Sequence, residues 1–544
     1  MATVTGSELL ARSLHAIGTD TLFFIMGGPM IETESELLRL GVRGIDTRHE
    51  QAASIMAHAY TRLRRRPGVC MGASGPGATN LVTGVANAFT DAAPVVAIGG
   101  SSPRVYLGME AFQEIDQVAV FRPITKWAER IYDARRIPEF VETAFRQATT
   151  GRPGPVYLDL PGDILGEKVE ESTVTYPAPW RPGPRSFGDP AAVREAIALL
   201  ARAQRPLVVA GSGVLWSDGP AALQAFVEAA GIPFYTTPIS RGLIPEDHRL
   251  AFLNARAKAF AEADVILAVG TRFNYVIQFG RAPRFAADLK IIHIDVNPTE
   301  LGHNRPVDVP IAGDARAVLE QLVAEGKGTL DPKRYTAWVG KLKAIDTEKA
   351  AEMAKAMSTD QTPIHPLRLC KEVRDFLRRD AILAVDGQEI LNFGRQSIPT
   401  FVPGHRLNSG PFGCMGVGLP FGVGAKVAKP DAQVVVLHGD GSYGINAMEI
   451  DTAVRHRVPV IVVISNNGGW TADPQRNKPG RNLGFTRYDR VAIDFGAHGE
   501  FVEKAHEIRP ALERAAASGK PAVVNVITDD TARAQTVRFS AYTT

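Results

Sequence analysis

Polar residues follow two apolar runs in the last third of the chain, at the point where each run ends. Asp440 comes shortly after the run Val434–Leu437, and Asn467 comes shortly after the run Val460–Ile464. The stretch between them has the length of one strand–helix–strand unit, and parallel neighbouring strands end at the same edge of a sheet, where α/β proteins bind ligands. Carboxylate and amide oxygens, together with the backbone carbonyl of Gly469, are the hard ligands that Mg²⁺ prefers. The sequence therefore predicts a magnesium site with Asp440, Asn467 and Gly469 as ligands.

The turn after the first of these runs also suits a diphosphate. Gly441 and Ser442 follow Asp440 directly and offer backbone N–H groups at the start of a predicted helix, a position that attracts anions. A capped turn beside an unrelated loop would give a similar pattern. The two polar motifs at this spacing favour a single site in which Mg²⁺ bridges to a diphosphate.

A carboxylate near the N-terminus is a candidate acid–base group. Glu50 lies in the segment Thr47–Ala53, which reads as a strand end followed by a helix. Taken alone, it could be an ordinary helix-start charge that the helix dipole favours. A second motif follows in Gly72–Asn80, whose glycines permit close approach of a ligand to the backbone, although a tight strand–helix turn would need the same residues.

Together, these motifs resemble the thiamine-diphosphate enzymes of the pyruvate-oxidase-like superfamily, and the resemblance covers essentially the whole chain. It implies that Glu50 hydrogen-bonds N1′ of the aminopyrimidine and promotes loss of the proton from carbon 2 of the thiazolium ring. It also implies that Met415 wedges the cofactor into a V shape and that the carbonyl of Gly413 receives the pyrimidine amino group, although a core methionine is the alternative. The remaining cofactor contacts that it implies are Gly75, Pro76, Asn80, Gly387, Gln388, Gly441 and Ser442.

The middle of the chain carries the pattern of a nucleotide site. An apolar strand runs into a glycine turn at Gly211, and later strand ends carry Arg272 and Asp295, which suit a phosphate and a ribose hydroxyl. Superfamily relatives hold ADP or FAD here, or nothing. Resemblance to the CoA-using members favours ADP, as an activator or a structural ligand, and places CoA near Arg256. The expected ADP-binding residues are Arg152, Gly211, Arg272, Asn274, Asp295 and Asp314.

Several segments look closest to the 2-hydroxyacyl-CoA lyases and oxalyl-CoA decarboxylases. They include Gly270–Phe285 and the pair Phe112-Gln113, which the resemblance places over the thiazolium ring, where the decarboxylases carry a Tyr–Glu pair. An apolar ring and a neutral amide suit an uncharged acyl group and a hydroxyl, so Phe112 and Gln113 join Glu50 as candidate catalytic residues, with packing as the alternative role of Gln113. The implied reaction is the reversible cleavage of the C1–C2 bond of a 2-hydroxyacyl-CoA into formyl-CoA and an aldehyde or ketone.

Other activities stay open at this point. An acetolactate-synthase-like enzyme or a glyoxylate carboligase would use FAD in the middle domain, and an oxalyl-CoA decarboxylase would use the same thiamine site. A non-catalytic relative would only bind nucleotides, but the presence of Glu50, Asp440 and Asn467 together argues against it. The sequence leaves open the acyl chain, its branching and the direction of the reaction.

The elements that must position these residues form three blocks. At 544 residues, the chain is too long for one hydrophobic core. A Pro- and Gly-rich stretch at Thr175–Pro190 and a charged stretch at Gly326–Pro363, helical from Lys341 to Met357, separate blocks in which strands and helices alternate. We therefore predict three doubly wound, parallel-sheet α/β domains: a pyrimidine-binding domain at 1–175, a Rossmann-like nucleotide-binding domain at 190–330, and a domain for the diphosphate and Mg²⁺ at 360–544.

Composition limits the partners and the compartment. A formal net charge of +3 gives no reason to expect nucleic acid or a membrane as a partner, and no apolar run approaches the about 18 residues of a membrane span. Three widely spaced cysteines without a CxxC pair fit a reducing cytoplasm. The resemblance implies a homodimer or homotetramer with active sites between chains. The segment Ala532–Thr544 has few apolar anchors and is expected to close over the CoA site as a lid.

Overall fold

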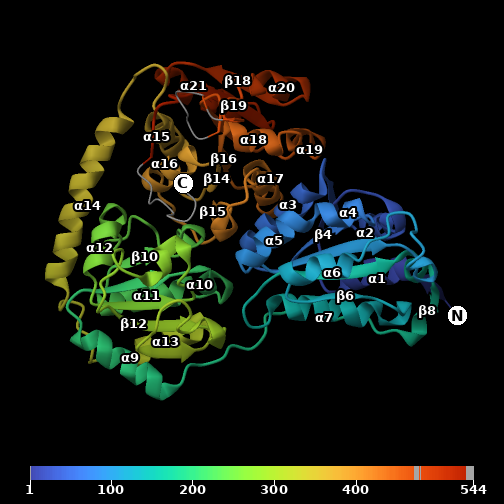
Figure 1. The fold of residues 1–544 in the computed structure, drawn as a ribbon, viewed down its shortest axis with the longest axis horizontal. Helices are drawn as coiled ribbons and strands as arrows, with labels where there is room; N and C mark the ends of the chain where they lie inside the picture. Colours follow the sequence, from blue (N-terminus) through green and yellow to red (C-terminus); the bar gives the residue numbers. More distant parts are fainter. Residues whose placement is uncertain (1, 471–476, 478, 535–544) are drawn as a thin grey trace.

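Three parallel sheets, one in each third of the chain, form the framework of the molecule (Figure 1). The computed structural model describes residues 2–470, 477 and 479–534. Helices flank every sheet, so the predicted fold of three doubly wound α/β domains is confirmed. Most of the strands are nearly continuous apolar runs, as expected where helices cover both faces of a parallel sheet.

The N-terminal sheet has the strand order β3-β2-β4-β5-β7-β6, and all of its pairings are parallel. Its strands are β2 (Thr21–Phe24), β3 (Arg43–Asp46), β4 (Gly68–Gly72), β5 (Val95–Ser101), β6 (Ala128–Arg130) and β7 (Val156–Pro161). Its helices are α1 (Gly6–Ala16), α2 (Ile31–Arg39), α3 (Glu50–Arg64), α4 (Pro76–Asn80), α5 (Val82–Thr90), α6 (Gln117–Phe121), α7 (Ile137–Thr149) and α8 (Gly162–Gly166).

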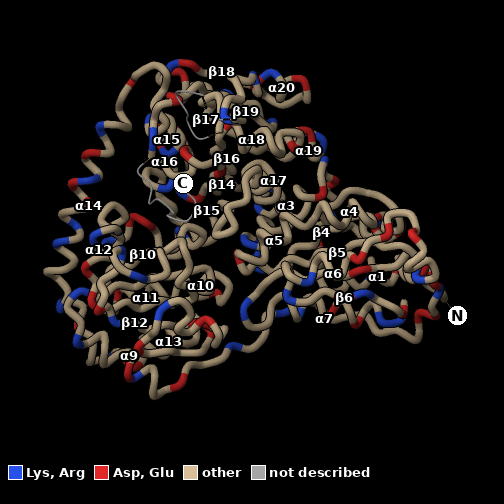
Figure 2. The backbone as a smooth tube through the Cα atoms, viewed as in Figure 1, with Lys and Arg blue, Asp and Glu red and all other residues tan. Residues whose placement is uncertain are grey.

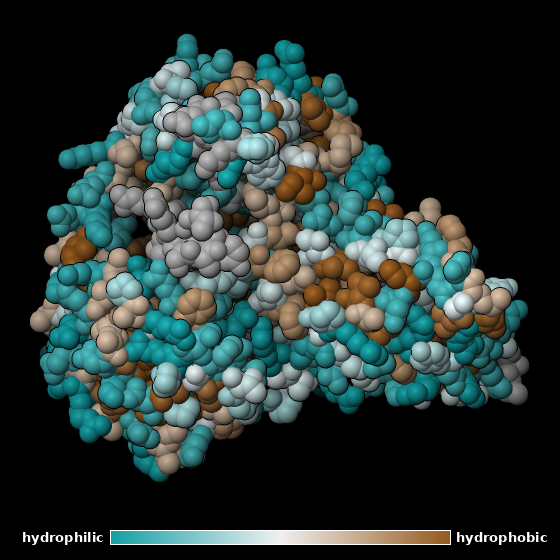
Figure 3. Space-filling model, viewed as in Figure 1, coloured by the Kyte–Doolittle hydropathy of each residue, from teal (hydrophilic) through white to brown (hydrophobic). Residues whose placement is uncertain are grey.

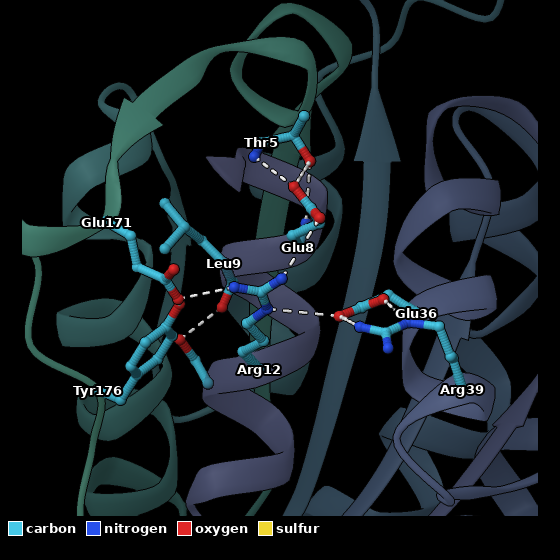
Figure 4. Close-up of polar contacts among 9 residues, drawn as sticks. Thr5, Glu8, Leu9, Arg12, Glu36, Arg39, Glu171 and Tyr176 are labelled. Atoms are coloured by element: carbon cyan, nitrogen blue, oxygen red, sulfur yellow. Dashed lines mark hydrogen bonds and ion pairs between the residues drawn. The ribbon is translucent and has the colours of Figure 1, made fainter. Parts of the chain in front are cut away.

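A polar network closes the outer end of this domain, where β1 (Thr3–Thr5) pairs with β8 (Lys168–Glu170). Figure 4 shows Arg12 of α1 reaching between Glu36 of α2 and Glu171, which follows β8. The hydroxyl of Tyr176 also donates to Glu171, at 2.9 Å. These contacts hold the start of the following connector against the N-terminal domain.

The middle sheet has five parallel strands in the order β10-β9-β11-β12-β13. They are β9 (Pro206–Ala210), β10 (Phe234–Thr236), β11 (Val265–Val269), β12 (Lys290–Asp295) and β13 (Val309–Ala312). The flanking helices are α9 (Pro190–Arg202), α10 (Ser212–Trp216), α11 (Pro220–Ala230), α12 (Arg256–Glu262) and α13 (Ala315–Glu325).

The C-terminal sheet has six parallel strands in the order β15-β14-β16-β17-β19-β18. They are β14 (Ile382–Asp386), β15 (Arg406–Leu407), β16 (Val434–Gly439), β17 (Ile461–Asn466), β18 (His498–Val502) and β19 (Ala522–Ile527). The helices are α15 (Pro366–Phe376), α16 (Glu389–Ser397), α17 (Gly418–Ala428), α18 (Asp440–Ile445), α19 (Glu449–Arg455), α20 (Tyr488–Asp494) and α21 (Ile508–Ala517).

The two connecting stretches differ in structure, as their compositions indicate. The Pro-rich stretch runs without helix or strand from residue 174 to 189, and in Figure 1 it crosses from the N-terminal domain to α9. The charged stretch contains α14 (Thr336–Met357), which begins five residues before the predicted start at Lys341. Acidic and basic positions are interspersed along α14 (Figure 2), which lies along the side of the molecule from the middle to the C-terminal domain. No described helix is long and apolar enough to cross a membrane.

The N-terminal and C-terminal domains pack through α3 and α17. A side-chain carbon at Gly424 would lie 2.5 Å from the carbonyl oxygen of Met56, so the two helices approach as closely as glycine allows. Farther along α3, the buried guanidinium of Arg62 donates to the carbonyls of Ile239 in the middle domain and Arg406 in the C-terminal domain, at 2.6 and 3.0 Å. Helix α3, which begins with Glu50, is therefore held by all three domains.

Candidate active site

The predicted metal ligands meet at the carboxyl edge of the C-terminal sheet. Asp440 follows β16, Asn467 follows β17, and these strands are direct neighbours. The inward-facing end of the Asn467 amide lies 3.1 Å from Oδ1 of Asp440 and 2.9 Å from the carbonyl oxygen of Gly469. Adjacent oxygen ligands of an octahedral Mg²⁺ lie about 3.0 Å apart, since each bond is about 2.1 Å long. With the amide oxygen inward, the Asn467 oxygen therefore lies at the spacing of neighbouring metal ligands from both of the other oxygens. With the nitrogen inward, they would form two hydrogen bonds instead.

The environment of Asp440 also fits a bound cation. Its Oδ2 is buried and has no hydrogen-bond partner among the described residues. Burial raises the pKa of this carboxyl to about 7, a penalty on the ionised form that a divalent cation would offset. Among the described residues, no group of three or more His, Cys, Asp or Glu side chains is placed to hold a metal. A cation here would therefore depend on one carboxylate and neutral oxygens, which suits Mg²⁺ bound together with a phosphate.

A narrow cavity adjoins these oxygens and is lined by five of the residues predicted to contact the cofactor. Those that line it are Gly387, Gln388, Met415, Gly441 and Ser442. Trp470 closes one side, where its ring packs over Gly441 so tightly that a side-chain carbon at that glycine would lie 2.9 Å away. Ala532 also borders the cavity, but most of the predicted lid, residues 535–544, lies outside the described residues.

The candidate acid Glu50 is the first residue of α3, and neighbouring polar groups fix its position. The amide Nδ2 of Asn80 donates to Oε2 of Glu50 at 2.9 Å. The turn before the helix is held from the C-terminal domain, because a carboxylate oxygen of Glu449 accepts the backbone N–H groups of Arg48 and His49, both at 3.1 Å. Burial raises the pKa of Glu449 to about 7. Sequence reasoning did not single out Glu449, which lies inside the helix predicted after Asp440.

The glycine-rich turn and the Phe112-Gln113 segment contact each other. Gly75 has a φ of +57°, and a side-chain carbon there would lie 2.7 Å from Cβ of Gln113, so only glycine fits. Gln113 itself has a φ of +60°, and its Oε1 accepts a hydrogen bond of 2.6 Å from Ser74 Oγ. A left-handed conformation costs a non-glycine residue about 1–3 kcal/mol and is concentrated at functional sites. The backbone geometry therefore favours a functional role for Gln113.

The chain brings these groups together as two separate half-sites. No described residue of the N-terminal domain lines the cavity beside Asp440 or the larger cavity that includes Met415 in its lining. Phe112 is 86% exposed, and other apolar side chains near it are exposed as well. Figure 3 shows an apolar area on this part of the N-terminal domain, near α6. The exposed apolar residues of the segment are Val105, Tyr106, Leu107, Met109, Phe112 and Ile115.

The larger cavity, of about 680 Å³, lies between the middle and C-terminal domains. Its lining includes Gly413 and Met415 and also Arg256, Arg284 and Arg395. None of these three arginines forms an ion pair with another described residue, and burial lowers the pKa of Arg256 and of Arg395 to about 10. The guanidinium groups of Arg256 and Arg284 both stack on Phe260, at 5.1 and 5.4 Å from its ring centre. Sequence reasoning identified Arg256 but not Arg284 or Arg395.

The six residues expected to bind ADP are only partly brought together. Arg152 pairs with Glu300 at 3.4 Å and is close enough to Arg272 and Asp295 for their charges to affect it. Arg272 and Asn274 line the large cavity, but the other four residues do not. Gly211 and Asp314 have local structural roles. A side-chain carbon at Gly211 would lie 2.2 Å from the carbonyl oxygen of Gly270, and Asp314 caps α13 by accepting the N–H of Ala317.

Comparison with known proteins agrees with this geometry. Residues 4–120 and 392–526 match family models described as the N-terminal and C-terminal TPP binding domains of thiamine pyrophosphate enzymes. Residues 193–322 match the model of their central domain. The chain is 38% identical to an acetolactate synthase large subunit of Mycobacterium tuberculosis, with 97% of this chain and 96% of the relative covered.

Two relatives with other activities match over similar lengths. The chain is 34% identical to a 2-hydroxyacyl-CoA lyase of Arabidopsis thaliana, with 98% of this chain and 97% of the relative covered. It is 33% identical to an oxalyl-CoA decarboxylase of Escherichia coli, with 97% and 95% covered. The relatives therefore share one cofactor family but differ in their substrates.

Proposed function

Because the chain belongs to the thiamine pyrophosphate enzyme family, we propose that it is a lyase that cleaves the C1–C2 bond of a 2-hydroxyacyl-CoA, reversibly, into formyl-CoA and an aldehyde or ketone. The observation that carries this choice is the arginine-lined cavity that leads to Met415. CoA is a long molecule with several phosphate charges. The three arginines of the cavity, which have no ion-pair partner among the described residues, could bind those phosphates. The small 2-oxo acids that carboligases use need no such cavity.

The residues of the chain would have separate roles in binding the metal, supporting the cofactor and transferring a proton. Asp440, Asn467 and Gly469 would hold Mg²⁺ against the diphosphate, and Met415 would support the bent cofactor. Bound thiamine diphosphate supplies a nucleophilic ring carbon and accepts the electron pair of the broken carbon–carbon bond. Glu50, fixed by Asn80, would exchange a proton at N1′ of the aminopyrimidine.

Residues of both half-sites would contact the substrate. Gln113, held by Ser74, would orient the substrate hydroxyl, and Phe112 would pack on an uncharged acyl group. A second copy of the chain would bring Glu50 and Gln113 to the Met415 end of the large cavity, so we expect a homodimer or homotetramer. The separation of the two half-sites and the exposed apolar surface around Phe112 support this assembly.

We predict that Arg256→Met raises KM for a CoA thioester about tenfold and leaves kcat nearly unchanged, because a charged hydrogen bond to a phosphate is lost while the side-chain stem stays on Phe260. Steady-state kinetics with a CoA thioester and with the matching pantetheine thioester, which lacks the nucleotide, would check this. Arg316→Met, on the exposed face of α13, is a control with an equal loss of charge. Equal effects of Arg256→Met on both thioesters would contradict a CoA site here.

The second candidate is an acetolactate-synthase-like carboligase, which the 38% identity to such an enzyme favours. For the nucleotide of the middle domain, we expect ADP rather than FAD near Arg152, Arg272 and Asp295. These two cations lie near Glu300 and near the buried Asp295 carboxylate, whose pKa burial raises to about 6. Mass spectrometry of the denatured protein separates the two nucleotides. Bound FAD, with acetolactate formed from pyruvate, would favour the carboligase.

A further inference from the structure

Two buried side chains lie directly behind the cofactor-binding edge of the C-terminal sheet. Asp386 ends β14 and His438 lies near the end of β16, and the two are paired in register across these strands. Their exposed fractions are 2% and 0%. Asp386 precedes Gly387, and His438 lies two residues before Asp440, so each side chain sits next to a segment that lines the diphosphate cavity.

Both side chains hold the turn that follows Met415. Oδ2 of Asp386 accepts the backbone N–H of Gly418 at 3.0 Å, and its Oδ1 accepts that of Gly387 at 2.7 Å. Nε2 of His438 accepts the N–H of Leu419 at 2.8 Å. The bonds to Gly418 and Leu419 satisfy N–H groups at the start of α17 that have no partner within the helix. A side-chain carbon at Gly418 would lie 2.4 Å from Nε2 of His438, so the imidazole lies directly against the turn.

The second ring nitrogen of His438, Nδ1, contacts the hydroxyl of Ser442. Since Nε2 accepts a hydrogen bond, the ring proton of the neutral imidazole is on Nδ1, which lies 2.9 Å from Oγ of Ser442. The Ser442 hydroxyl then accepts from His438 and is left to donate, and it donates to the carbonyl of Gly439 at 3.0 Å. Because Ser442 lines the adjoining cavity, its hydroxyl could rotate and donate the same proton to a phosphate oxygen bound there. His438 thus fixes the hydroxyl as a donor.

We propose that Asp386 and His438 are positioning residues for the cofactor, which join the Met415 turn to the diphosphate-binding turn. The two buried side chains would fix the turn after Met415, which supports the bent cofactor, and would orient Ser442 toward the phosphates. The inference rests on the proposed cofactor site and not on the identity of the acyl substrate, so a different substrate would leave it standing.

Two substitutions of His438 separate its two contacts. In His438→Gln the amide reaches the place of Nε2 and keeps an acceptor for Leu419, but it loses the donor to Ser442. In His438→Asn the amide reaches the place of Nδ1 and keeps the donor, but it loses the acceptor. We expect each variant to raise Kd for Mg²⁺–thiamine diphosphate about tenfold, as for loss of a hydrogen bond to a charged ligand or to its support. Quenching of protein fluorescence reports this Kd, because Trp470 borders the cavity.

Controls distinguish positioning from a general loss of stability. Tyr443→Phe removes a buried hydroxyl without a partner among the described residues, so its Kd should equal that of the wild type. Adding Ser442→Ala to His438→Gln should weaken binding no further than Ser442→Ala alone, because His438→Gln acts only through the Ser442 hydroxyl, which Ser442→Ala removes. Adding it to His438→Asn should weaken binding further. The unfolding temperature of each apo-protein reports any purely structural effect.

A Kd within about twofold of the wild type in both His438 variants would overturn the proposal, as would full additivity of His438→Gln with Ser442→Ala. If the His438 variants do not fold, the Kd of Asp386→Asn for Mg²⁺–thiamine diphosphate tests the proposal instead. This substitution keeps the shape of the side chain but can no longer accept both the Gly387 and Gly418 N–H groups. An unchanged Kd in that variant would equally overturn the proposal, whatever thioester the enzyme cleaves.

Discussion

Glu50→Gln is expected to lower turnover about 10²–10⁴-fold while leaving the affinity for thiamine diphosphate nearly unchanged, the range typical of a positioned acid–base group. Glutamine keeps the shape of the side chain and an oxygen that can accept from Nδ2 of Asn80, so the start of α3 should not move. It cannot exchange a proton at N1′. Single-turnover rates, with Kd measured separately, would show a loss confined to chemistry.

Glu513→Gln is a suitable control for this variant, because it neutralises an exposed glutamate on α21 that forms an ion pair with the surface residue Arg509. Its turnover should match the wild type. Near-normal turnover of Glu50→Gln itself would remove Glu50 from the catalytic machinery. A large loss of cofactor affinity would instead assign it a binding role.

Asp440→Ala is expected to abolish retention of the cofactor, raising Kd for Mg²⁺–thiamine diphosphate by at least about a hundredfold, since it removes the one carboxylate among the three predicted metal ligands. The other carboxylates that line the adjoining cavity are held by other groups, since Glu389 accepts the backbone N–H of Ala534 at 2.9 Å and Asp529 accepts that of Thr531 at 2.7 Å. Titration calorimetry and the cofactor content of the purified protein would both report the loss. Asp431→Ala, at an exposed position before β16, is the control.

The same two variants test whether active sites form between chains. If Glu50 of one chain serves Asp440 of another, co-expressed Glu50→Gln and Asp440→Ala chains would form mixed dimers in which one site is intact, and random pairing would restore about a quarter of the activity. No restored activity in mixed dimers shown to form would place both residues in one chain's site.

How far the site could be predicted depends on how local its parts are. Asp440 and Asn467 are separated by one strand–helix–strand unit, so their meeting at one sheet edge follows from the topology of parallel strands alone. The turn at Gly75 was recognisable for a similar reason, since a glycine with positive φ leaves a clear pattern. The fold class likewise followed from the alternation of buried runs and helices.

Other parts depend on contacts between distant segments, and no local pattern contains them. Arg284 and Arg395 belong to different domains and meet only because a cavity forms between those domains. Glu449 holds the turn before Glu50 from some four hundred residues away. His438 sat inside the motif that drew attention to Asp440, yet its role appears only when β14 and the turn before α17 are placed beside it.

The most direct test of the proposed cleavage of a 2-hydroxyacyl-CoA is to identify the products of the reaction. The holoenzyme would be incubated with straight and branched 2-hydroxyacyl-CoA thioesters, with oxalyl-CoA and with pyruvate, and the products separated by liquid chromatography and mass spectrometry. We expect formyl-CoA and an equal amount of aldehyde or ketone from at least one 2-hydroxyacyl-CoA, formed faster than any product from oxalyl-CoA or pyruvate. Faster turnover of oxalyl-CoA than of every 2-hydroxyacyl-CoA, or acetolactate as the main product, would contradict it.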